Sequence, residues 1–154
     1  MGRAEHSRNA IVTSLLNATL ASIKAVIPVE PQVNKPQLLT EQCHLNFGVL
    51  VGITGDMNGK LVFTGETETF SSISKVLYQM PLEGDMLLSF SGELGNMIAG
   101  GMATHLTAGD ANSVMITTPT ILQGNTKLSG YKQALKLGVL FENIGQLDTY
   151  LLID

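Results

Sequence analysis

The sequence predicts an α+β domain in which long helices pack on a mostly antiparallel sheet. Apolar residues recur at helical spacing over residues 9–27 and again from residue 85 to about 106. Strand-like segments occur in consecutive runs with helices between the runs, which is typical of antiparallel pairing. The 154 residues suit a single domain over 1–154, with residues 1–8 expected to be disordered.

The first half of the chain is predicted to contain a helix, an edge strand and a hairpin. Pro28 ends the helix, because proline cannot continue the hydrogen-bond ladder. Pro36 lacks the amide hydrogen that an inner strand would donate, so its strand is placed at an edge. The expected elements are a helix over 9–27, an edge strand over 32–40, and hairpin strands over 44–54 and 60–64 joined by a turn over 55–59.

The second half is predicted to contain a short helix, a long helix and three strands. Asp85 is expected to cap the long helix, and Gly109 with Asp110 to end it. Pro119 should interrupt the strand that follows, and Gly124–Asn125 should turn the chain. The expected elements are helices over Thr67–Tyr78 and 85–106 and strands over 113–123, 133–142 and 146–153, the last two joined by a turn over 143–145.

Composition excludes several classes of partner. Nine Lys and Arg against thirteen Asp and Glu give a net charge of −4, and the basic residues are scattered, so neither nucleic acid nor an anionic membrane is expected to bind. No apolar run approaches the ~20 residues of a membrane span, and the N-terminus lacks the layout of a signal peptide. A lone Cys43 cannot form an internal disulfide, which fits a reducing cytoplasm.

The surface is expected to be partly covered by another protein. Charged residues make up 14% of the chain, well below the average of about 25%. Seven Met residues add flexible apolar side chains. A partner or a second copy would bury such a surface.

Most catalytic signatures are missing from the chain. There is no G-x-x-x-x-G-K-[ST] loop for a nucleotide phosphate and no G-x-S-x-G nucleophile elbow. His6, His44 and His105 fall in different elements without cysteine partners, so a zinc site is not expected. The chain is therefore expected to bind no metal or cofactor of its own.

The long helix carries the most informative segment, residues 89–104. Glu93, Asn96 and Gly100 share one helix face, because residues three or four apart are neighbours on a helix. A carboxylate and a carboxamide therefore project side by side. Glycines here weaken the helix by roughly 0.5–1 kcal/mol each relative to Ala, a cost that the close approach of another backbone would offset. The four glycines are Gly92, Gly95, Gly100 and Gly101.

These residues taken alone leave a structural explanation open. A glutamate near a helix N-terminus is favoured by the helix dipole without any further role. The glycines would also let the helix pack closely on the sheet. An E-x-x-N pattern recurs by chance in many proteins, so the pattern does not separate the two explanations.

Residues 92–100, Gly-Glu-Leu-Gly-Asn-Met-Ile-Ala-Gly, resemble the signature of the CheC/CheX/FliY phosphatases of bacterial chemotaxis. Residues 117–124 resemble the strand that follows this signature in CheX, and the opening helix and the hairpin fit in order. CheC-type members carry two E-x-x-N motifs, whereas this chain has one. The resemblance is therefore to the CheX side of the family, which implies a homodimer with one site per subunit, formed by pairing of edge strands.

The resemblance implies a hydrolase that removes the phosphoryl group from the aspartyl phosphate of a CheY-like response regulator. The regulator would supply the phosphorylated Asp, Mg²⁺ and a Lys, so the chain itself needs only positioning groups. Asn96 would orient the attacking water and Glu93 would pair with the regulator's Lys. Gly92, Gly95 and Gly100 would let the two backbones approach. Two alternatives from other classes are a non-catalytic adaptor that binds a receiver domain and a structural dimerisation module.

Overall fold

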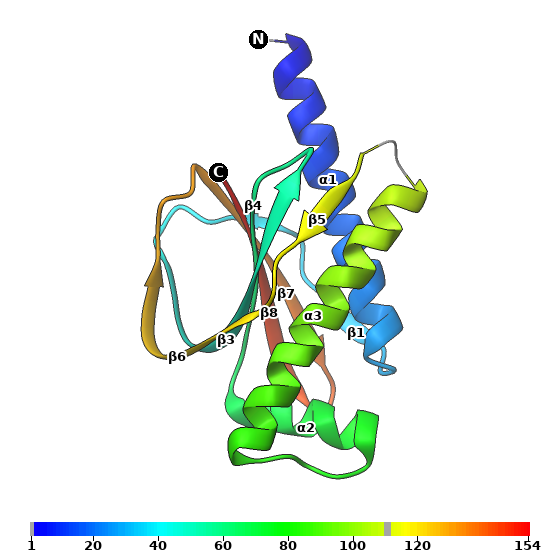
Figure 1. The fold of residues 1–154 in the computed structure, drawn as a ribbon, viewed down its shortest axis with the longest axis vertical. Helices are drawn as coiled ribbons and strands as arrows, with labels where there is room; N and C mark the ends of the chain where they lie inside the picture. The colour runs from blue at the N-terminus through cyan, green and yellow to red at the C-terminus, as the bar shows by residue number, and fades with distance from the viewer. Residues whose placement is uncertain (1, 110–111) are drawn as a thin grey trace.

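Residues 2–109 and 112–154, which the computed structural model describes, form three helices and one sheet of eight antiparallel strands (Figure 1). This confirms the predicted α+β class. The helices are α1 (Gly2–Val26), α2 (Thr67–Tyr78) and α3 (Gly84–Gly109). The strands are β1 (Pro31–Val33), β2 (Gln37–Leu38), β3 (Cys43–Gly55), β4 (Gly59–Thr64), β5 (Val114–Ile116), β6 (Thr120–Leu128), β7 (Gln133–Phe141) and β8 (Gly145–Ile153).

Strand β3 organises one side of the sheet, because it pairs with β4, β5 and β6 along different parts of its length. The order β1-β7-β8-β4-β3-β5 forms the main path, with β2 on β7 and β6 on β3. Strands β1 and β2 pair with the same side of β7, and Pro36 lies between them. The predicted placement at an edge is confirmed, but the single strand predicted over 32–40 is wrong, because the chain forms two short strands there.

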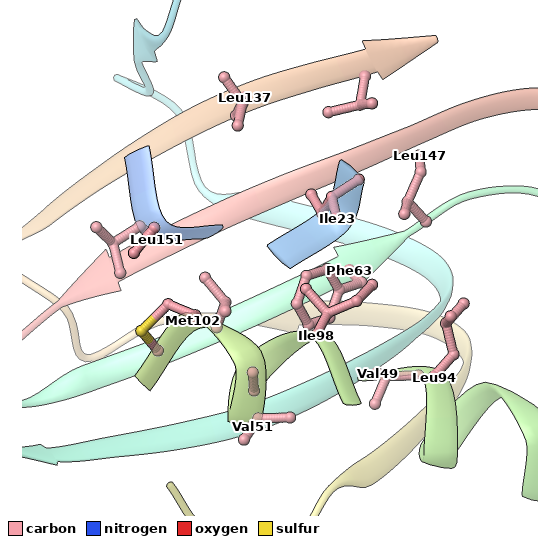
Figure 2. Close-up of a cluster of buried hydrophobic side chains, with 14 of the residues drawn as sticks. Ile23, Val49, Val51, Phe63, Leu94, Ile98, Met102, Leu137, Leu147 and Leu151 are labelled. Carbon is pink, nitrogen blue, oxygen red and sulfur yellow. The ribbon is translucent and has the colours of Figure 1, made fainter. Parts of the chain in front are cut away.

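Helices α1 and α3 lie side by side on one face of the sheet, and α2 crosses below α3 at one end (Figure 1). Figure 2 shows the core between these layers, with Leu94, Ile98 and Met102 of α3 directed at the sheet. These three side chains are at most 1% exposed. Because α3 buries this face against the sheet, its opposite face is left to solvent.

A second, smaller apolar cluster lies on the other face of the sheet, where no described helix covers it. Cys43 and Tyr150 belong to it. Burial raises the pKa of the Cys43 thiol. Burial, followed by the nearby Asp148 carboxylate and Cys43, raises the pKa of Tyr150 to about 12.

Two predicted helix starts are wrong. Helix α1 begins at Gly2 rather than at residue 9. Helix α3 begins at Gly84, which has a φ of +60°, so Asp85 lies in the first turn and is not the cap. The predicted end at Gly109 is confirmed, and Asp110 lies outside the described residues.

The turn predicted at Gly124–Asn125 is also wrong, because β6 continues through both residues to Leu128. The pairing register of β3 and β6 shifts between Leu45 and Phe47, opposite this point. Gly124 has a φ of +80°, which suits the extra residue of a β-bulge. The chain turns later, over residues 129–132, where Gly130 has a φ of +85°.

One part of α1, Asn9–Val26, is apolar and long enough to span a membrane by length and composition, with a mean hydropathy of 1.2. This stretch differs from the expectation that no apolar run approaches the length of a membrane span. In the fold this part of α1 packs against α3, and Ser22 donates a 2.6 Å hydrogen bond to the carbonyl of Ile98. Ile23 and Ile27 are fully buried. Of the stretch Asn9–Val26, 39% is buried inside the fold.

Candidate functional site

Glu93 and Asn96 project from the outward face of α3. Glu93 is exposed and Asn96 is half-buried, while Leu94 and Gly95 between them are buried. The two polar side chains are three residues apart, so they stand one turn apart on the same side of the helix. The prediction that they share a face is confirmed by these exposures.

Both side chains are free to meet a partner. Neither Glu93 nor Asn96 forms a side-chain hydrogen bond or an ion pair with any residue of 2–109 or 112–154. The helix that carries them is fixed by its buried face, so the backbone positions of Glu93 and Asn96 are fixed relative to each other. A partner that approaches this face would meet an unpaired carboxylate and an unpaired amide.

The connection between β5 and β6 forms one side of this face. Thr117 anchors the connection to Gly52 of β3, with the Gly52 amide 2.8 Å from the Thr117 hydroxyl and the Thr117 amide 3.0 Å from the Gly52 carbonyl oxygen. Pro119 and Ile121 then lie against α3 at Gly92. The break that Pro119 makes in the strand therefore brings the start of β6 against the helix next to Asn96.

Two of the predicted docking glycines have close neighbours within the protein itself, and their role in docking stays a prediction. Gly92 and Gly95 are buried. A Cβ at Gly95 would lie 2.6 Å from Cγ1 of Val49, and a Cβ at Gly92 would lie 3.3 Å from Cδ1 of Ile121. These glycines admit the protein's own sheet, which is the structural explanation that the sequence left open.

Gly100 and Gly101 differ in the same way. A Cβ at Gly101 would collide with the Ser22 side chain of α1, so this glycine lets α1 and α3 approach. A Cβ at Gly100 would meet only Cδ1 of Ile116, at an ordinary 3.9 Å. Of the three predicted docking glycines, Gly100 is half-buried and lies near Asn96, whereas the other two are buried. Its role in docking stays a prediction.

No group of three or more His, Cys, Asp or Glu able to hold a metal occurs in the part of the chain that the structure describes. His44 is exposed and pairs with Asn125 on β6. His105 lies at the exposed end of α3, three turns from Glu93. The site therefore offers one carboxylate and one amide on a rigid helix, which can position another molecule's reactive groups.

Comparison with known proteins identifies the family. The family described as chemotaxis phosphatase CheX matches residues 47–141, which include the whole of α2, α3 and the helix face described above. The chain belongs to the CheX family. It is 31% identical over 134 residues to the CheY-P phosphatase CheX of Thermotoga maritima, covering 84% of this chain and 86% of that protein.

Several solved structures have the same fold as this chain. CheX from Desulfovibrio desulfuricans superposes with a TM-score of 0.77 at 18% identity, over 94% of this chain and 99% of that chain. CheX in the CheX-CheY-BeF3-Mg²⁺ complex from Borrelia burgdorferi superposes with a TM-score of 0.75 at 22% identity, over 92% and 96%. A CheC-like protein of Shewanella gives a TM-score of 0.77 at 20% identity, over 92% and 97%.

Two exposed apolar side chains lie beside the polar pair and were not among the predicted site residues. Tyr78 and Met86 are 53% and 63% exposed, and both border the same hollow as Glu93. The signal was present in the spacing, because Met86 precedes Glu93 by two helical turns and so lies on the same face. Apolar residues on a helix ordinarily belong to its buried side, so spacing alone does not distinguish Met86 from a core residue.

Proposed function

We propose that this chain hydrolyses the aspartyl phosphate of a CheY response regulator, with Asn96 and Glu93 as the groups that act on it. The observation that carries the proposal is the unpaired Glu93 and Asn96 on the outward face of α3, in a chain of the CheX family. A relative with 31% identity is a CheY-P phosphatase.

Asn96 would orient the water that attacks phosphorus. An amide both donates and accepts hydrogen bonds and carries no charge, so it can hold a water without repelling the phosphoryl oxygens. Because α3 is fixed by its buried face, Asn96 enters the partner's site with little freedom left to lose. The regulator would hold Mg²⁺, which neutralises charge on the phosphoryl group.

Glu93 would set the register of the complex. Its exposed carboxylate can pair with a Lys of the receiver domain in a charge-assisted hydrogen bond. The one-turn separation of Glu93 and Asn96 would then place the amide at a fixed distance from that Lys. The gain in rate would come from positioning, which suits a site without a metal or a nucleophile of its own.

The setting proposed for this reaction is the cytoplasm, where a response regulator is found, with the chain acting as a homodimer that has one site per subunit. The low charge and the seven methionines support a covered surface. The exposed edge of β1 supports strand pairing as one way to cover it.

The test is the loss of phosphate from phosphorylated CheY of the same organism, measured with and without the purified full chain. The chain should accelerate the loss, and Asn96→Ala should lower the acceleration by about 100-fold while the melting temperature is kept. Asn17→Ala is the matched control, because Asn17 is an exposed asparagine on α1. An Asn96→Ala protein with full activity would overturn the role of Asn96, and a chain that binds phosphorylated CheY without hydrolysis would be an adaptor.

A further inference from the structure

A hollow of about 520 Å³ lies directly beside Glu93, where the end of α2 and the first turns of α3 meet. Two apolar side chains on its walls are exposed to solvent: Tyr78 is 53% exposed and Met86 is 63% exposed. Phe90 forms the buried floor and meets the Tyr78 ring edge-on, with ring centroids 5.6 Å apart. Tyr and Met are enriched where proteins bind other proteins.

The hollow is held in shape by hydrogen bonds from α2. Leu82 lines it from the loop between α2 and α3. The Leu82 amide donates to the hydroxyl of Ser74, and the hydroxyl of Ser71 donates to the Leu82 carbonyl, both at 3.0 Å. Both backbone groups of Leu82 are thus bonded, so the loop is fixed before any partner arrives. A preformed site loses less conformational freedom on binding.

The rim of the hollow is acidic. Asp85 and Glu93 border it, and none of its lining residues is a Lys or Arg. An apolar floor with two carboxylates at the rim suits an apolar side chain that has a cationic neighbour. A second copy of this chain, with a net charge of −4, offers poorer charge complementarity.

The hollow is continuous with the polar pair on α3. Met86 precedes Glu93 by seven residues, so the two lie about 10.5 Å apart along the same side of the helix. A stable interface covers about 800 Å² on each partner. A protein that docks on Glu93 and Asn96 therefore also covers Met86 and Tyr78.

We propose that this hollow, bordered by Tyr78, Met86 and Phe90, is a docking pocket for the receiver domain of the phosphorylated response regulator. It takes an apolar side chain with a basic neighbour from the receiver surface next to the phosphorylated aspartate. The inference rests on the function proposed above and adds a determinant of affinity to it. The hollow binds the receiver surface, while Asn96 acts at the phosphoryl group and Glu93 pairs with the receiver's Lys.

The test is the Met86→Lys variant, which places a cation where the partner's basic group would lie. Its KM for phosphorylated CheY should rise at least tenfold, with kcat within twofold of the unchanged protein. The dissociation constant for CheY activated with beryllofluoride and Mg²⁺, which does not turn over, should rise by the same factor. Met86 is exposed, so the folded state should tolerate the change.

Met115→Lys is the matched control. Met115 is 72% exposed on β5, between Val114 and Ile116, which face the main core, so it lies on the sheet face away from α3. Its KM should not change. An unchanged KM for Met86→Lys, or an equal rise for Met115→Lys, would overturn the docking pocket while the phosphatase activity stands. An inactive wild-type chain would overturn the proposed function itself.

Discussion

The inward face of α3 packs against the sheet, whereas the outward face of the same segment presents polar side chains to solvent. The inward face has Gly95 so close to Val49 that a methyl group has no room, and Leu94, Ile98 and Met102 on it are buried. The outward face carries Glu93 and Asn96 without a partner among the described residues. Close packing on one side fixes the helix, and that rigidity is what makes the free groups on the other side useful.

The largest expected effect is a loss of activity on the outward face of α3, at Asn96. Asn96→Ala should lower kcat on phosphorylated CheY by about 100-fold, a loss of the size seen when one positioned polar group is removed from an active site. The melting temperature should stay within the error of calorimetry, because Asn96 bonds to no described residue. A large drop in melting temperature would show that this face also stabilises the fold.

The inward face should respond in stability. Gly95→Ala should lower the free energy of unfolding by about 1–3 kcal/mol, because the new Cβ would lie 2.6 Å from Cγ1 of Val49. Urea denaturation measures this effect. Gly100→Ala is the counterpart, and it should raise stability by up to about 1 kcal/mol because its Cβ meets only Ile116 at 3.9 Å. Equal effects of the two changes would contradict the division between the faces.

Glu93→Gln keeps the shape of the side chain and removes its charge. We expect KM to rise about tenfold, since the amide cannot form the charge-assisted bond proposed for the carboxylate. The dependence of KM on salt should weaken in the variant, because a charge pair in the complex has been removed. Steady-state rates at two ionic strengths measure both effects, and an unchanged salt dependence would argue against a charged contact at Glu93.

The last expected effect lies on the far face of the sheet and is visible only at high pH. The raised pKa of Tyr150, about 12, means that the folded state favours the neutral phenol. The unfolded chain ionises near pH 10, so this stability is present below pH 10 and is lost as the pH rises toward 12. Tyr150→Phe should remove that part of the decline. Denaturation at pH 9 and pH 11.5 measures it, and an identical decline in both proteins would contradict it.

Much of the fold could be predicted from local patterns. Helix α2 was predicted at its observed bounds, and the hairpin of β3 and β4 within one residue at each strand end, because turn residues and apolar periodicity act over short stretches. The bulge at Gly124 could not be predicted in this way. A glycine followed by an asparagine is typical of a turn, and only the pairing of β6 with β3 makes it a bulge.

The sequence by itself determined the class of the fold, the pairing of Glu93 with Asn96 on one helix face, and the resemblance to the CheX family. Helix geometry places Glu93 and Asn96 on one face whatever surrounds the helix. Only the tertiary structure decided which side chains pack against each glycine of α3. It alone also decided that Met86 and Tyr78 border the same hollow as Glu93. Those contacts join α3 to β3, α1 and α2, and contacts between elements far apart in the chain are not written in any local pattern.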